Sequence, residues 1–79
     1  MISIKWNGDN YYLEFQEWTL NYILAKLFFL SLKEYQNILI NNGAFLSSIN
    51  GECYFVNKKD AKKAVEVLES IYILNKLTE

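Results

Sequence analysis

The sequence predicts a single α+β domain whose elements follow the order β-β-α-β-β-α. Two pairs of short runs alternate apolar and polar residues. In each pair, an Asn-Gly dipeptide, which is typical of hairpin turns, separates the first run from the second. A stretch with helical spacing of apolar residues follows each pair. These observations favour a four-stranded antiparallel sheet with two helices on one face. The 79 residues show no linker or change in composition, so we expect one small globular domain over residues 1–79.

The first hairpin is predicted over residues 2–15, with its turn at Asn7-Gly8 because both residue types tolerate positive φ. Strand alternation gives it one apolar face, made of Ile2, Ile4, Trp6, Tyr11, Leu13 and Phe15. Tyr12 and Trp18 share the polar phase of the second strand. We expect these two aromatic residues either to pack at an edge or to contact a partner.

A helix is predicted from Leu20, with Thr19 as its cap. Ser31 and Glu34 match the capping box that normally begins a helix. Two interpretations stay open: one helix to about residue 42, or two helices with a break near Ser31. One helix or a kinked pair is favoured, because neither Gly nor Pro intervenes. The expected core stripe consists of Leu20, Ile23, Leu24, Leu27, Tyr35, Ile38 and Leu39.

The second half of the chain repeats the pattern. Gly43 is able to end the preceding helix in a left-handed conformation. Residues 44–49 and 52–56 are predicted strands around a primed turn at Asn50-Gly51. Asn57 then caps the last helix, whose apolar stripe consists of Ala61, Ala64, Val65, Leu68, Ile71 and Tyr72.

The composition excludes most catalytic machinery. The chain has no His, and Cys53 is its only cysteine. It therefore lacks an imidazole base, a Ser-His or Cys-His pair, and a His-containing or Cys-rich zinc site. We predict that the protein is not an enzyme and that it has no catalytic residue, metal or cofactor. Cys53, which lies in a predicted strand, is expected to be a packed and inert thiol.

The sequence predicts a cytoplasmic protein without membrane contact. Its N-terminus lacks the basic and apolar regions of a signal peptide. The most apolar window, residues 23–32, has about ten residues, whereas spanning a bilayer takes about 20. A small domain without a disulfide fits a reducing compartment.

The first helix carries the main candidate contact surface. One of its stripes mixes lysines, which imply solvent, with large apolar side chains, and exposed apolar stripes mark interaction surfaces. The candidate partner-binding residues are Tyr22, Lys26, Phe29, Lys33 and Ile40, together with Tyr12 and Trp18. The expected partner is a larger host protein or complex, or a second copy of the chain bound through this helix. In the other interpretation, a break near Ser31 shifts the phase of the helix and buries Phe29.

A second candidate surface is basic. Lys58, Lys59, Lys62 and Lys63 point away from the apolar stripe of the last helix, where phosphate or an acidic partner could bind. Glu66 lies within reach of the last two on the helix, which is typical of surface pairing. The net charge of −1 and the absence of Arg argue against nucleic acid. A small nucleic-acid- or nucleotide-binding protein is therefore the alternative hypothesis.

In its size and its Lys-, Asn-, Ile- and Tyr-rich composition, the chain resembles small proteins encoded by phages of AT-rich hosts, including anti-CRISPR and other anti-defence inhibitors. The resemblance is one of composition, without a shared motif, so it assigns no role to any residue. It implies an inhibitor that occupies a site on a larger host protein. The leading hypothesis is thus a non-enzymatic protein-binding module of the inhibitor type.

Overall fold

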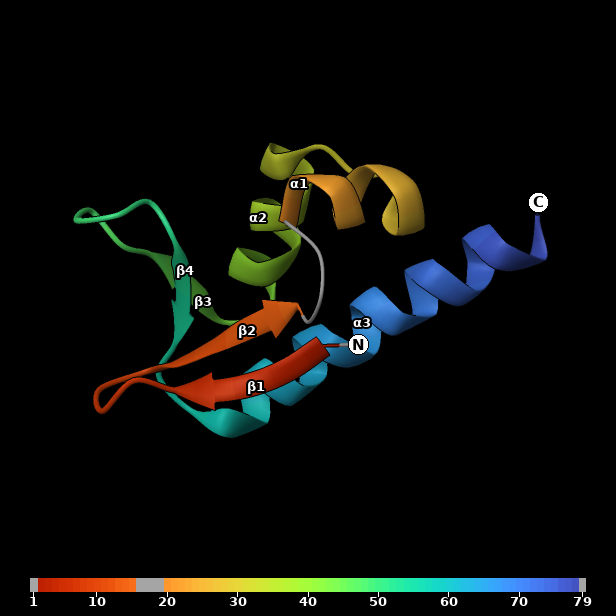
Figure 1. The fold of residues 1–79 in the computed structure, drawn as a ribbon. Coiled ribbons are helices and arrows are strands. Elements are labelled where there is room, and N and C mark those ends of the chain that lie inside the picture. The colour runs from red at the N-terminus through yellow and green to blue at the C-terminus, as the bar shows by residue number, and fades with distance from the viewer. Residues whose placement is uncertain (1, 16–19, 79) are drawn as a thin grey trace.

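The computed structural model describes residues 2–15 and 20–78 and has the predicted α+β architecture (Figure 1). Its elements are β1 (Ile2–Trp6), β2 (Tyr11–Phe15), α1 (Leu20–Ile23), the π-helical segment η1 (Leu24–Phe28), α2 (Leu32–Asn41), β3 (Ala44–Leu46), β4 (Cys53–Phe55) and α3 (Lys58–Leu77). The four strands form one antiparallel sheet in the order β1-β2-β4-β3. The strand order brings the two hairpins together through β2 and β4.

The β1–β2 hairpin turns at Gly8, as predicted, but its two-residue loop is Gly8-Asp9 rather than Asn7-Gly8. The N–H of Asn7 donates to the carbonyl of Asn10 at 3.1 Å and encloses a loop of Gly8 and Asp9. Gly8 has a φ of 103°, whereas Asn7 does not take positive φ. The Asn7 side chain instead accepts the N–H groups of Asp9 and Asn10 at 3.0 and 2.9 Å. Asn7 therefore stabilises the turn by hydrogen bonds rather than by its backbone conformation.

The second hairpin has shorter strands and a wider loop than predicted. The N–H of Ser47 donates to the carbonyl of Glu52 at 2.8 Å, and this bond encloses residues 48–51. The prediction of a primed two-residue turn at Asn50-Gly51 was wrong, because Gly51 has positive φ but Asn50 does not. The Asn50 side chain accepts the N–H of Glu52 at 3.0 Å, and such local side-chain bonds stabilise wider turns.

The segment after β2 forms two helical units with a break before Ser31, which is the second of the two interpretations that the sequence left open; the favoured continuous helix is not formed. Phe29 ends η1 with left-handed backbone angles, φ 54° and ψ 42°, and its N–H donates to the carbonyl of Leu24. Ser31 then begins α2 through the predicted capping box. Its hydroxyl accepts the N–H of Glu34 at 3.1 Å, and the Glu34 carboxylate accepts the N–H of Ser31 at 3.0 Å. The capping box therefore begins a new helix at Ser31 although neither Gly nor Pro interrupts the sequence. The cap predicted at Thr19 lies outside the described residues.

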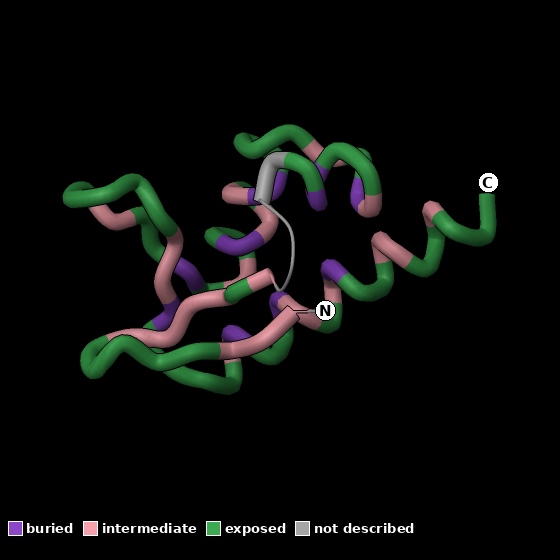
Figure 2. The backbone as a smooth tube through the Cα atoms, in the orientation of Figure 1, coloured by how far each residue is buried: buried purple, intermediate pink, exposed green. Residues whose placement is uncertain are grey.

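The helices pack most of their predicted apolar stripes against one face of the sheet (Figure 2). Val65 is only half-buried, and the side chain of Leu20 lies outside the described part of the structure. The buried core consists of Ile23, Leu24, Phe28, Tyr35, Leu39, Ala44, Phe55, Ala61, Ala64 and Leu68. The ring of Phe15 in β2 meets those of Phe28 and Tyr35 edge-on, at centroid distances of 6.2 and 5.9 Å. Trp6 was expected in this core but is 62% exposed, because it ends an edge strand that has a neighbouring strand on one side only.

Helix α3 has 20 residues, about 30 Å of length, and its C-terminal turns extend past the sheet (Figure 1). Asn57 caps its start as predicted, accepting the N–H of Asp60 at 3.0 Å. Further along, the Asn75 side chain donates to the carbonyls of Leu27 and Phe28 at 3.4 and 2.8 Å. These bonds attach the end of η1 to α3. No helix within residues 2–15 and 20–78 is long and apolar enough to cross a membrane.

Candidate functional site

The contact residues expected on the first helix are exposed, but they do not form one stripe. Tyr22 and Lys26 lie on α1 and η1, Lys33 and Ile40 lie on α2, and Phe29 lies at the break between them. The break therefore separates residues that a continuous helix would have aligned. The alternative expectation, that the break buries Phe29, is wrong because this side chain is 59% exposed. Trp18 lies outside the described residues.

Phe29 combines an exposed aromatic side chain with an unusual backbone. It is the one non-glycine residue with positive φ in the part of the chain that the structure describes. The left-handed conformation costs an ordinary L-residue about 1–2 kcal/mol, and helix ends of this kind normally carry Gly or Asn. Neither the backbone nor core packing therefore explains a phenylalanine at this position.

The structure holds the backbone before Phe29 firmly. The ring of Phe28 is buried and meets the ring of Tyr72 at a centroid distance of 6.2 Å. The carbonyl of Phe28 also accepts the hydrogen bond from Asn75. Phe29 follows directly, so α3 fixes the position from which its side chain projects.

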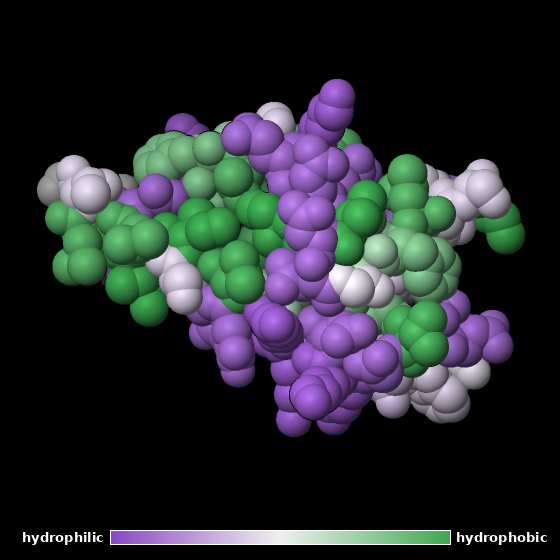
Figure 3. Space-filling model, turned by 180° about the vertical axis from the view of Figure 1, so that it is seen from behind, coloured by the Kyte–Doolittle hydropathy of each residue, from purple (hydrophilic) through white to green (hydrophobic). Residues whose placement is uncertain are grey.

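The C-terminal turns of α3 add exposed apolar surface on the same part of the molecule. Ile73, Leu74 and Leu77 are 55%, 62% and 77% exposed. Seen from behind, hydrophobic side chains gather over this end of α3 (Figure 3). The apolar stripe predicted for α3 faces the core, so these outward-facing residues are additional to it. They could have been identified in the sequence as apolar positions out of phase with that stripe.

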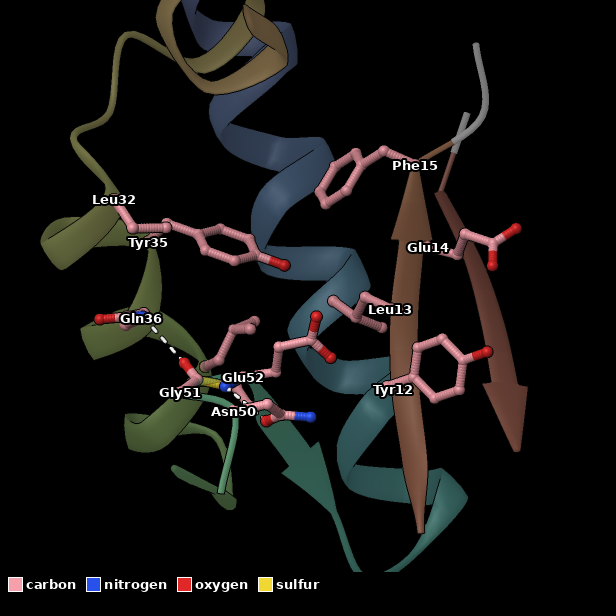
Figure 4. A pocket seen from close by; sticks show the side chains of 12 residues that line it. Tyr12, Leu13, Glu14, Phe15, Leu32, Tyr35, Gln36, Asn50, Gly51 and Glu52 are labelled. Atoms are coloured by element: carbon pink, nitrogen blue, oxygen red, sulfur yellow. Dashed lines mark hydrogen bonds between the residues drawn. The ribbon is translucent and has the colours of Figure 1, made fainter. Parts of the chain in front are cut away.

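A cleft of about 510 Å³ separates β2 from α2 and the β3–β4 loop (Figure 4). It exists because β2 and β4 pair only where Tyr11 faces Phe55. Continuing that register would place Leu13 opposite Cys53, but the strands diverge before these residues pair. The cleft is lined by Tyr12, Leu13, Glu14, Phe15, Leu32, Tyr35, Gln36, Leu39, Asn50, Gly51, Glu52 and Cys53.

Both diverging strands direct backbone polar groups toward the cleft. Hydrogen bonding alternates along an antiparallel ladder. Asn7 and Asn10 form a hydrogen-bonded pair at the β1–β2 turn. Counting along the strand from that pair, Leu13 belongs to a pair that is not hydrogen-bonded, so its N–H and C=O point away from β1. Ser47 and Glu52 likewise form a hydrogen-bonded pair at the β3–β4 loop. The next pair, Leu46 and Cys53, is not hydrogen-bonded, so the N–H and C=O of Cys53 point away from β3. A closed sheet would join these groups, whereas here they face each other across the opening.

Tyr35 forms part of the inner wall of the cleft. Its side chain is only 5% exposed, and its hydroxyl is directed toward β2 (Figure 4). Burial, with a smaller contribution from the charge of a Cys53 thiolate, raises the pKa of the Tyr35 hydroxyl far above its ordinary value. The hydroxyl therefore stays protonated and is able to donate a hydrogen bond within the cleft.

Cys53 lies half-buried in β4, in agreement with the packing role expected of it. Burial raises the pKa of its thiol, which lowers the fraction of reactive thiolate. Beside it, the Gln36 amide donates to the carbonyl of Gly51 at 3.4 Å and links α2 to the β3–β4 loop. Within the described residues, no three His, Cys, Asp or Glu side chains are grouped to hold a metal ion.

Tyr12 takes part in a row of aromatic rings on the sheet face that no described helix covers. Its ring meets that of Tyr54 at 6.1 Å, and Tyr54 in turn meets Phe45 at 6.2 Å. The Tyr54 hydroxyl donates to the Glu52 carboxylate at 3.1 Å and accepts from the Asn50 amide at 2.9 Å. Tyr12 is half-buried and packs on Tyr54 within the sheet rather than at an edge, because β2 lies between β1 and β4.

The four lysines of the basic patch, Lys58, Lys59, Lys62 and Lys63, are all exposed on the first turns of α3. Among the described residues, neither Lys62 nor Lys63 lies within ion-pair distance of Glu66. The surface pairing with Glu66 that the sequence predicts is therefore not formed among the described residues.

Comparison of the chain with models of known protein families, with curated proteins and with solved structures gave no match.

Proposed function

We propose that the chain is a non-enzymatic protein-binding module that occupies a site on a larger protein, with Phe29 as its anchor. The observation that carries this proposal is the exposed phenyl ring of Phe29 on a left-handed backbone. Stability alone favours Gly or Asn at such a position. Large aromatic side chains contribute strongly at the centres of interfaces, so contact with a partner gives the ring a role that folding does not.

Two further features support the proposal. The neighbouring end of α3 exposes Ile73, Leu74 and Leu77, and grouped apolar surface favours protein contact. The hydrogen bonds from Asn75 fix the backbone that precedes Phe29, and a preorganised anchor loses less conformational entropy on binding. The resemblance in composition to phage-encoded inhibitors supports an inhibitory outcome of binding.

The test is affinity capture from a host lysate with the wild-type protein, Phe29→Glu and the control Ile49→Glu immobilised in parallel. Ile49 is 94% exposed on the β3–β4 loop, so the control adds a carboxylate at an apolar position on a loop that projects away from the segment joining α1 to α2 (Figure 1). We expect the proteins that wild type and Ile49→Glu retain to be lost from Phe29→Glu, with the melting temperature nearly unchanged. Equal retention by folded Phe29→Glu would overturn the proposal.

A nucleic-acid- or nucleotide-binding function is the second candidate, supported by the four exposed lysines at the start of α3. Phosphate contacts release counterions, so such binding weakens steeply with salt. Anisotropy of a labelled single-stranded oligonucleotide tests it between 50 and 200 mM salt. Binding that falls by about tenfold or more and disappears in Lys59→Ala/Lys63→Ala would favour this candidate. Absence of binding at low salt would exclude it.

A further inference from the structure

We infer that the cleft between β2 and β4 binds an extended, cationic segment of a partner protein, which adds to the sheet as a strand. The inference rests on the proposed function only in taking the partner to be a protein, and it uses a surface other than Phe29. The two surfaces therefore have separate tests.

The backbone supplies the first argument. Leu13 and Cys53 direct N–H and C=O groups into the opening from opposite walls. Backbone polar groups need hydrogen-bond partners, from protein or from water. An extended peptide offers the complementary donors and acceptors along both of its edges, which is the basis of binding by strand addition.

The side chains lining the cleft fit the alternation of a strand. Tyr35 and Leu39 of α2 form a buried wall on the helix side of the sheet. Asn50 and Glu52 form a polar rim on the β3–β4 side. Successive side chains of a strand point to opposite faces. Apolar residues of an inserted segment would meet the wall, and the residues between them would meet the rim.

The charge of the cleft indicates which side chains of a bound segment its polar rim would favour. The residues that line the cleft include two acidic ones, Glu14 and Glu52, and no lysine. The Glu52 carboxylate extends across the opening toward β2, while that of Glu14 lies on the outer side of β2 (Figure 4). Lys or Arg side chains on the outward face of the segment would meet the Glu52 carboxylate, because charge-assisted bonds to a carboxylate are stronger than neutral ones.

The experiment begins with selection of a displayed library of random heptapeptides on the wild-type protein. The enriched peptides are synthesised with a fluorescent label, and their binding is measured by anisotropy to wild type, Glu52→Lys and the control Glu69→Lys. Glu69 is exposed on α3, outside the cleft. We expect enriched peptides to alternate apolar residues with Lys or Arg. We expect binding to weaken at least tenfold in Glu52→Lys and to stay within twofold in Glu69→Lys.

A second measurement uses only the wild-type protein and separates strand addition from side-chain binding. Methylating alternate backbone nitrogens of the selected peptide should abolish binding, and the unmethylated peptide should slow hydrogen exchange at the Leu13 and Cys53 amides. Peptides that bind Glu52→Lys equally well, or that leave these amides unprotected, would overturn the inference, as would a library without enrichment. Peptide binding should be unchanged in Phe29→Glu. Failure at the cleft with Phe29-dependent capture intact would leave the proposed function standing.

Discussion

At the scale of single residues, burial changes the pKa of the Tyr35 hydroxyl. Burial of the ring, and to a smaller extent the nearby Cys53 thiolate, raises the pKa of its hydroxyl above the ordinary value of about 10. The folded state therefore keeps a proton that the unfolded chain releases in alkaline solution. The resulting stabilisation is complete below pH 10 and is lost as the pH rises through the folded pKa.

Tyr35→Phe should remove this pH dependence. Each unit of pH above 10 should lower the free energy of unfolding of wild type by up to about 1.4 kcal/mol more than that of the variant. The Cys53 thiol, whose pKa burial also raises, contributes in the same direction in both proteins. Urea unfolding between pH 8 and 11 measures the difference, and equal slopes would contradict the assignment.

Leu68 tests the core position of α3. It is fully buried at the centre of the stripe that the sequence predicted. Leu68→Ala should lower the free energy of unfolding by about 2–5 kcal/mol, because truncation leaves a cavity in the core. Urea denaturation measures the loss. A value below about 1 kcal/mol would mean that this face of α3 is not packed as described.

At the scale of elements, hydrogen-bonding signals in the sequence were more accurate than the absence of helix breakers. The Ser31–Glu34 capping box and the Asn57 cap lie where the sequence placed them. The break before Ser31 needed no Gly or Pro, because Phe29 itself adopts the left-handed conformation. Propensity disfavours that conformation for Phe, so the sequence could not indicate which residue would take it.

Ser31→Ala should destabilise the protein by about 0.5–2 kcal/mol, the usual cost of losing such a cap. The variant removes the acceptor for the N–H of Glu34 at the first turn of α2. Ser48→Ala is the matched control, since Ser48 is exposed in the β3–β4 loop. Chemical denaturation of both variants decides the point. A Ser31→Ala variant as stable as the control would show that the capping box does not stabilise α2.

At the scale of the whole molecule, alternation and helical spacing predicted the fold class, the element order and most of the core. They could not predict the cleft, because alternation assigns a residue to a sheet face without saying which distant strand it pairs with. The pairing of β2 with β4 stops after Tyr11 and Phe55. The sequence contains no local signal for that divergence. The exposure of Phe29 likewise depends on how η1 packs against α3.

The central claim is that Phe29 serves contact rather than stability, and the free energy of unfolding of Phe29→Asn tests it without knowledge of the partner. Asn accepts the left-handed conformation more readily than Phe does. We predict that urea denaturation will find the variant as stable as wild type, or more stable by up to about 1 kcal/mol. A loss of about 3 kcal/mol or more, typical of a truncated core aromatic residue, would contradict the account.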